Sequence, residues 1–223
     1  MSQSHEVELA GERLIAVAGK GLYWPSQSTL FVADVHLGKD SAMLATGIPV
    51  PFGATTETLG RLTQILHQTN AQKLVLLGDL WHAKQGRSER AYGEFIQWRE
   101  DHPDVEVVLV EGNHDVKSGR LTGNVRIEEV AEKTLLHPFV LCHYPQEDPS
   151  GYVLAGHVHP AVVLEGSGRQ AIKLPCFWFG DKYGVLPAFG EFTGCATVSP
   201  NSRDQVLVVA DSRIFSVSCS TAA

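Results

Sequence analysis

Long apolar runs are missing from this sequence. The longest stretches, KLVLLGDLW (73–81) and YVLAGHVHPAVVL (152–164), are interrupted by Asp, Gly or His, whereas a membrane span needs about 18 to 20 apolar residues in succession. The first residues, MSQSHEVELAGERL, lack both the basic segment and the apolar segment of a secretory signal. We therefore expect a soluble protein with no membrane partner, located in the cytoplasm.

Cysteine and positive charge are also scarce. The four cysteines, Cys142, Cys176, Cys195 and Cys219, are widely spaced and form no CxxC pair. Neither a zinc ribbon nor a redox motif is indicated, and we expect small buried thiols. The formal net charge of −7 argues against a broad basic surface for duplex DNA. A polyanionic substrate would therefore need a local positive site.

Strand-like and helix-like patterns occur along the whole chain. Residues 55–70 and 88–102 space their apolar side chains three and four apart, which predicts two helices; Thr residues are available to cap the first, and Gly93 weakens the second. Runs of β-branched and other apolar residues predict strands at 13–18, 29–34, 73–79, 105–112, 139–143, 152–157, 161–166, 205–211 and 213–218. The first half thus follows a β, α, β, α, β order, and the second half is a succession of strands, as in layered α/β folds.

The chain length favours one domain. With 223 residues, 43% of them hydrophobic, the sequence suits a single compact α/β domain over residues 1–223. Two domains divided near residue 120 are the alternative. We disfavour this alternative because the candidate site described next draws on both halves of the chain.

Polar side chains follow five of the predicted strands. In an open α/β sheet the carboxyl ends of strands are where ligands bind. Residues two apart on a strand point to the same side, which predicts that Asp34 with His36, and His157 with His159, converge on one point. In chain order the groups at these strand ends are Asp34 and His36, then Asp79, then Asn113, His114 and Asp115, then His143, then His157 and His159.

Carboxylate, amide and imidazole groups together form a mixed O/N ligand set. Such a set suits Mn, Fe, Zn or Co and lacks the all-oxygen cage that calcium prefers. Seven ligands are too many for one tetrahedral ion but suit two ions about 3.5 to 4 Å apart that share a carboxylate. Two divalent ions add +4 where Asp34 and Asp79 contribute −2. An acidic protein can therefore present one positive pocket.

The ordered motifs Asp-x-His, Gly-Asp, Gly-Asn-His-Asp, a single His and Gly-His-x-His resemble those of the calcineurin-like metallophosphoesterases, over roughly residues 29–160. The segments ADVHLGKD, GIPVPFG, GDLWH, LPCFWF and LPAFGEFTG extend the resemblance over nearly the whole chain. They are similar to the bacterial ligase-associated subfamily, which are DNA damage response endonucleases. This resemblance implies a four-layer αββα sandwich, two divalent ions that are usually manganese, and phosphodiesterase or nuclease activity on single-stranded DNA in repair. It also implies a DNA ligase and a helicase as candidate partners.

The resemblance assigns a role to each matched residue. Water activated by two ions would attack phosphorus in line. His114, oriented by Asp115, would stabilise the transition state or protonate the leaving oxygen, and Lys39 would join Asn113 and His114 in binding substrate. The ligands implied are Asp34, His36 and His159 for the first ion, Asn113, His143 and His157 for the second, and Asp79 as the bridge.

Several readings stay open from the sequence alone. Within enzymes the alternative is a small-molecule phosphoesterase acting on cyclic nucleotides or phosphomonoesters, and outside enzymes it is a non-catalytic scaffold of the same fold. His82 departs from the Asp or Glu of many relatives and is either a ligand-orienting residue or a surface histidine. Lys39 has an ordinary solvated lysine as its alternative role, and the connection 37–54 is either a substrate-facing loop or a structural cover. We expect Trp81 and Trp178 to pack in the core, with stacking on unpaired bases as the alternative.

Overall fold

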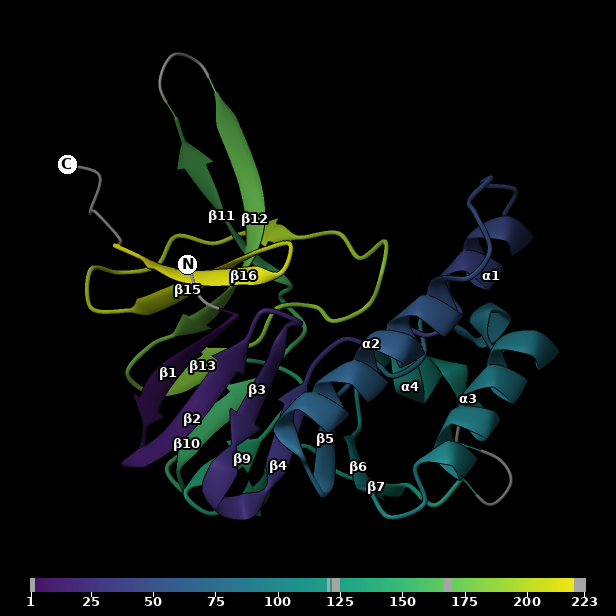
Figure 1. The fold of residues 1–223 in the computed structure, drawn as a ribbon, viewed down its shortest axis with the longest axis horizontal. Helices are drawn as coiled ribbons and strands as arrows, with labels where there is room; N and C mark the ends of the chain where they lie inside the picture. The colour runs from purple at the N-terminus through teal and green to yellow at the C-terminus, as the bar shows by residue number, and fades with distance from the viewer. Residues whose placement is uncertain (1–2, 120, 122–124, 167–169, 219–223) are drawn as a thin grey trace.

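Two mixed β-sheets lie face to face, and helices cover the outer face of the first sheet (Figure 1). The computed structural model describes residues 3–119, 121, 125–166 and 170–218, so Cys219 lies outside the described residues. Neighbouring strands are antiparallel from β1 to β4 and parallel from β4 to β7. In spatial order the first sheet consists of β1 (Ser4–Leu9), β2 (Glu12–Val17), β3 (Gly21–Trp24), β4 (Thr29–Val32), β5 (Lys73–Leu77), β6 (Glu106–Val110) and β7 (Glu128–Val130).

The second sheet is built from the second half of the chain. Its strands β9, β10 and β13 are parallel neighbours. The loop after β10 contacts the loop after β4, since the His157 amide donates to Asp34, so the carboxyl ends of these strands lie near those of β4 to β6. In spatial order it consists of β14 (Ala196–Thr197), β11 (Pro160–Glu165), β12 (Ala171–Phe179), β13 (Tyr183–Val185), β10 (Tyr152–Ala155), β9 (Phe139–Leu141) and β8 (Thr134–Leu136), with β15 (Gln205–Ala210) and β16 (Arg213–Val217) branching from β12.

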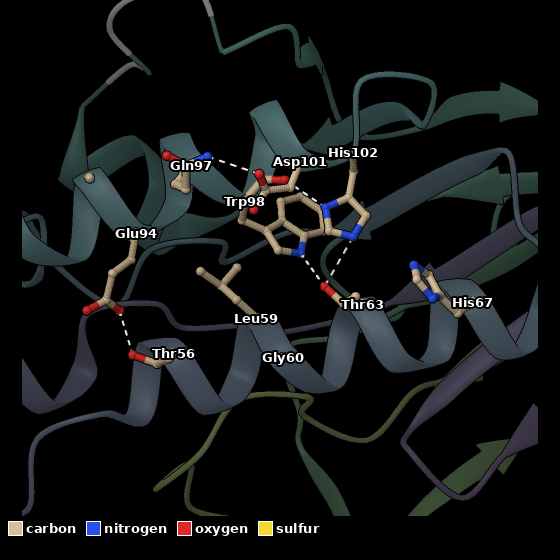
Figure 2. A pocket seen from close by; sticks show the side chains of 11 residues that line it. Thr56, Leu59, Gly60, Thr63, His67, Glu94, Gln97, Trp98, Asp101 and His102 are labelled. Atoms are coloured by element: carbon tan, nitrogen blue, oxygen red, sulfur yellow. Dashed lines mark hydrogen bonds between the residues drawn. The ribbon is translucent and has the colours of Figure 1, made fainter.

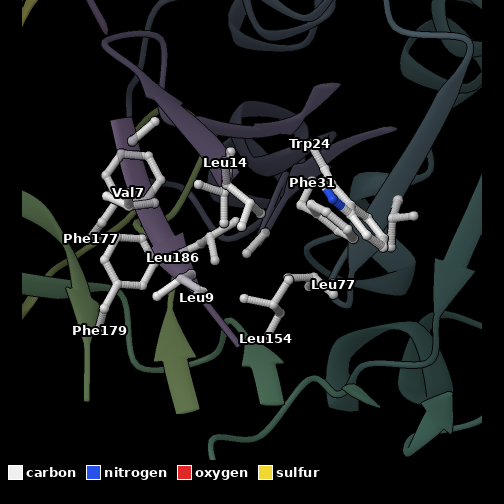
Figure 3. Close-up of a cluster of buried hydrophobic side chains, with 14 of the residues drawn as sticks. Val7, Leu9, Leu14, Trp24, Phe31, Leu77, Leu154, Phe177, Phe179 and Leu186 are labelled. Atoms are coloured by element: carbon white, nitrogen blue, oxygen red, sulfur yellow. The ribbon is translucent and has the colours of Figure 1, made fainter. Parts of the chain in front are cut away.

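The main core fills the space between the sheets. Side chains alternate along each strand, so Phe31 on β4 and Leu77 on β5 meet Leu154 and Phe177 of the other sheet (Figure 3). Phe139 lies edge-on against Trp24, with ring centroids 5.0 Å apart. Because this core takes residues from both halves of the chain, the two halves fold together.

Helices form a second core on the outer face of the first sheet. Ile65 on α2 and Phe95 on α3 pack against Leu76 on β5, and both predicted helices are confirmed. The side chain of Ser88 caps α3 by accepting from the Ala91 amide, but α2 begins after Gly53, at φ 112°, without a side-chain cap, so the predicted Thr cap is wrong. The helices are α1 (Lys39–Ala45), α2 (Ala54–Thr69), α3 (Glu89–Asp101) and α4 (Asn113–Ser118), with short 3-10 turns η1 (Pro25–Gln27) and η2 (Lys84–Gly86).

The predicted α/β sandwich is confirmed, and the connection 37–54 contains a helix of its own, α1. The α-helices of the described residues all lie between positions 39 and 118. On the outer face of the second sheet, Cys142 and Val153 belong to a small apolar cluster, and Gln146 from the connection after β9 contacts the Cys142 thiol. Cys176 is also buried, as expected, whereas Cys195 is only partly buried. No helix within the described ranges is long and apolar enough to cross a bilayer.

We expect Phe139→Ala to lower the free energy of unfolding by about 3 to 5 kcal/mol, because it leaves a cavity between the sheets. The matched control is Leu135→Ala on β8, where the side chain is 55% exposed and the expected change is within about 0.5 kcal/mol. Urea denaturation followed by circular dichroism measures both. Equal effects of the two substitutions would show that the core is not where the structure has it.

Candidate metal centre

The predicted ligands lie in turns beyond the strand ends. β4 ends at Val32 and β10 at Ala155, so Asp34, His36, His157 and His159 are not on strands. Their backbones take left-handed conformations, with φ of 53°, 48°, 67° and 50° respectively. Asp34 and His36 converge as predicted, whereas His157 and His159 turn toward two different groups of side chains. The expected reason, strand alternation, is wrong for both pairs. Tight left-handed turns aim these side chains instead.

A first group comprises Asp34, His36 and His159. His159 Nε2 lies 3.3 Å from His36 Nε2 and 3.4 Å from Asp34 Oδ1. The Nδ1–H of His159 donates to the Gly194 carbonyl (2.9 Å), which leaves a lone pair on Nε2. Asp34 Oδ1 is buried and has no hydrogen-bond partner among the described residues. His159 Nε2 and Asp34 Oδ1 are thus two acceptors that face each other without a donor between them.

A second group comprises Asp79, His143, His157 and Asn113. His143 donates from Nδ1 to the Leu77 carbonyl (3.2 Å), so Nε2 carries its lone pair. That nitrogen lies 3.0 Å from Asn113 Oδ1, 3.0 Å from His157 Nδ1 and 3.5 Å from Asp79 Oδ2. The second group therefore repeats the pattern of the first.

Asp79 joins the two groups. Its Oδ2 is 3.5 Å from His143 Nε2 and 3.9 Å from His36 Nε2. Its Oδ1 accepts from the His114 amide at 2.9 Å, which holds the carboxylate in place. This position between the groups is the one that a bridging carboxylate requires.

The pKa values of the groups at the centre shift in different directions. Burial, with smaller contributions from the nearby His159 and Lys39, lowers the pKa of His36 to about 2. Burial also raises the pKa of Asp79, although His143 opposes this shift. For His159, burial lowers the pKa, but the nearby Asp34 carboxylate and the Gly194 carbonyl outweigh burial, so the net shift is upward. Neutral imidazole is the form that binds metals.

The residues fit two divalent ions. A buried acceptor without a donor costs about 1 to 3 kcal/mol, and both groups contain several acceptors that face each other. A cation within each group would satisfy all of them at once, and mixed oxygen and nitrogen ligands suit borderline divalent ions. The first group would hold one ion, the second group the other, and Asp79 would contact both.

His114 is oriented differently from the sequence prediction. Its Nδ1–H donates to the His82 carbonyl, and its Nε2 lies 3.9 Å from Asp79 Oδ2. Asp115 instead accepts from the amides of Trp81 (3.2 Å) and Gly112 (3.1 Å), and burial raises its pKa to about 7. The predicted contact from Asp115 to the His114 ring is therefore wrong, because the carboxylate ties two loop backbones together.

His82 and Lys39 lie beside the centre. The His82 ring stacks on His114, with centroids 5.3 Å apart and planes 19° apart, and it is also 5.3 Å from the His36 ring. The Lys39 charge lowers the pKa of both His36 and His82, so a cationic side chain borders the site. The role of Lys39 in binding substrate stays a prediction.

The comparisons with known proteins agree with this geometry. A model of the calcineurin-like phosphoesterases matches residues 28–140. The chain belongs to this family. Among solved structures, the crystal structure of Pseudomonas putida nuclease MPE is 37% identical, with a TM-score of 0.85, and the match covers 96% of this chain and 100% of that one. The phosphoesterase Yfce from E. coli is 18% identical, with a TM-score of 0.42 over 86% and 99% of the two chains. Among curated proteins no match was found.

Family membership makes this chain a phosphoesterase, a hydrolase with a dinuclear divalent metal site. The reading as a non-catalytic scaffold is therefore not supported. The ordered motifs were the informative sequence signal, since each of them lies at the centre. Single histidines outside the motifs lie elsewhere: His67 on α2 and His137 are exposed, and His5 and His102 are partly buried.

Other residues of the centre carry no recognisable sequence signal. Glu132 accepts from the amides of both His143 and Tyr144, each at 2.9 Å. The Gly194 carbonyl selects the tautomer of His159. Glu132 belongs to no motif and lies eleven residues before His143. Gly194 ends the LPAFGEFTG segment, but a backbone carbonyl is present at every position and gives no signal of its own. The expected core packing of Trp81 is confirmed, since its side chain is buried in the helix-covered core, and the alternative stacking role is excluded.

A separate groove of about 660 Å³ lies between α2 and α3 (Figure 2). Its polar groups bond to one another: Trp98 Nε1 donates to Thr63 Oγ1 (3.0 Å), which also contacts His102 Nε2 (3.1 Å). None of its lining residues is a predicted ligand. The groove is therefore distinct from the candidate metal centre.

We expect protein loaded with Mn²⁺ and freed of excess metal to retain two ions per chain. His159→Ala and His157→Ala should each retain less metal, because each removes a ligand from one group, with affinity reduced about tenfold or more. His67→Ala, at an exposed position, is the matched control. Elemental analysis by mass spectrometry checks all three, and a wild-type metal content in both ligand variants would refute the site.

Proposed function

We propose that this chain is a manganese-dependent phosphodiesterase that cuts DNA internally, prefers single strands and acts in DNA repair in the cytoplasm. The observation that carries the proposal is the pair of acceptor groups joined by Asp79 Oδ2, 3.5 Å from His143 and 3.9 Å from His36. The likeness to a nuclease of 37% identity over nearly the full chain supports DNA as the substrate. The resemblance to the ligase-associated subfamily supports a DNA ligase and a helicase as partners.

The ions, when bound, would supply Lewis acidity, which polarises a phosphoryl oxygen and lowers the pKa of a water molecule. The protein's own side chains do the rest. His114 holds its Nδ1 proton on the His82 carbonyl, and its Nε2 lies on the side of Asp79. A carbonyl on one ring nitrogen stabilises the imidazolium, so Nε2 can deliver a proton to the leaving oxygen.

Charge distribution supports a single strand over a duplex. The chain carries a net charge of −7, and the cationic side chain at the centre is Lys39. A rigid duplex needs phosphate contacts spread along its length, whereas a flexible strand can bring one phosphate to one positive pocket. Asn113, His114 and Lys39 would bind that phosphate.

The decisive experiment digests circular single-stranded and circular duplex DNA side by side in Mn²⁺. We expect fragments from the single-stranded circle and much slower cutting of the duplex, because circles offer no ends to an exonuclease. An Asp79→Asn preparation, purified in parallel, excludes a contaminating nuclease. Intact circles of both kinds, together with hydrolysis of bis-p-nitrophenyl phosphate, would point to a small-molecule phosphoesterase instead.

We expect His114→Ala to slow cleavage of DNA by about a hundredfold or more, the usual contribution of a general acid. The effect on bis-p-nitrophenyl phosphate should be much smaller, because p-nitrophenolate leaves without needing a proton. His67→Ala serves as the histidine control. Equal losses on both substrates would remove the acid role from His114.

A further inference from the structure

Two aromatic side chains are exposed beside the candidate metal centre. Tyr144 is 40% exposed and Phe192 is 50% exposed. Large apolar side chains usually lie inside a protein, so exposure next to a site is informative. The two tryptophans considered from the sequence are less suited to contact a substrate. Trp81 is buried, and the Trp178 indole donates to Asp204 (2.8 Å).

Tyr144 borders the second ligand group. Its ring centroid lies 4.3 Å from that of His157 and 5.0 Å from that of His143. Its amide donates to Glu132 (2.9 Å), which also holds the His143 amide. The tyrosine ring is thus fixed against two predicted ligands while part of it faces solvent.

Phe192 lies on a loop that is hydrogen-bonded to the first ligand group. The chain around it is bonded to that group twice, because the Gly190 amide donates to the Asp34 carbonyl (3.0 Å) and the Gly194 carbonyl accepts from His159 (2.9 Å). A Cβ at Gly190 would lie 2.2 Å from the Val35 carbonyl oxygen, so the loop approaches the centre as closely as a backbone can.

The backbone of Phe192 is strained, with φ at 55°. A bulky residue with positive φ is rare, and such strain is retained where the surroundings impose it, often at functional sites. Arg61 imposes it in part, since it pairs with Glu191 and bonds the Phe189 carbonyl. An exposed phenyl ring in a strained loop gains little from core packing.

We propose that Tyr144 and Phe192 are base-stacking residues, one at each end of the dinuclear centre, which hold unpaired bases on the two sides of the bound phosphate. The inference rests on the proposed function and deepens it, because it names the residues that select single strands. Bases in a duplex already stack on one another, so only an unpaired base can lie on a protein ring. Stacking is indifferent to base identity and needs no positive surface, which suits an acidic chain.

The test compares two strands of equal length, one of ordinary DNA and one of tetrahydrofuran abasic units. Both strands have the same phosphates, but only the first has bases. Fluorescence anisotropy gives the affinity of each strand, and gel analysis in Mn²⁺ gives its cleavage. The variants are Phe192→Ala, Phe192→Leu, Phe192→Trp, Tyr144→Ala and Tyr144→Phe, with Leu135→Ala on β8 as the exposed apolar control. Thermal unfolding and manganese content verify that each variant is folded and loaded.

We expect the wild-type protein to bind the ordinary strand more tightly than the abasic one, and Phe192→Ala and Tyr144→Ala each to weaken binding of the ordinary strand roughly tenfold. Binding of the abasic strand should change by less than about twofold, since it has no base to stack. Phe192→Leu should behave as Phe192→Ala does, whereas Phe192→Trp and Tyr144→Phe should keep the preference, because only they retain an aromatic face.

Several results would overturn the inference. If the wild-type protein cuts single-stranded DNA but binds the ordinary and abasic strands equally, the two rings do not stack on bases. If the variants weaken binding of both strands equally, the two rings have a structural role and do not stack on bases. A wild-type protein that hydrolyses bis-p-nitrophenyl phosphate but cuts neither strand refutes the proposed function itself, and the inference falls with it.

Discussion

The centre of this protein depends on buried acceptor atoms that have no donor between them. Asp34 Oδ1 is without a hydrogen-bond partner in the described chain, and unprotonated ring nitrogens of His159 and His143 point toward it or toward Asp79. Such a cluster is unfavourable for the protein alone. The folded state is stabilised chiefly by the apolar core between the sheets. The cluster itself would become favourable when divalent cations are bound.

Backbone amides of the loops that carry these groups form hydrogen bonds from one loop to the next. The His36 amide donates to the Asp79 carbonyl (2.9 Å), the Asp34 amide to the Gly78 carbonyl (3.2 Å), and the His157 amide to Asp34 Oδ2 (2.8 Å). Left-handed residues each cost about 1 to 3 kcal/mol and persist where many contacts impose them. Gly78 is required in this network, since a Cβ there would lie 2.2 Å from His143 Nδ1. Small displacements of one loop are thereby resisted by all the others.

Specificity and reactivity have different physical sources in this arrangement. Reactivity requires positive charge at the centre, which Lys39 and bound divalent ions would supply. Strand selection, as we propose it, requires apolar faces rather than charge, and Tyr144 and Phe192 supply these at the edge of the same centre. An acidic protein can therefore act on a polyanion without a basic surface that would hold any nucleic acid.

Local patterns in the sequence determined the element types and the identity of the groups at the centre. Apolar periodicity identified α2, α3 and strands such as β5, because burial of one face requires that spacing whatever the fold. Strand β12 was missed, since Pro175 interrupts its pattern, and α1 was missed within a segment rich in Gly and Pro. Only the tertiary structure decided how His114 is held, which carbonyl selects the His159 tautomer and which aromatic rings border the centre. These depend on backbone atoms and turns brought together from distant segments, and a carbonyl group leaves no mark in a sequence.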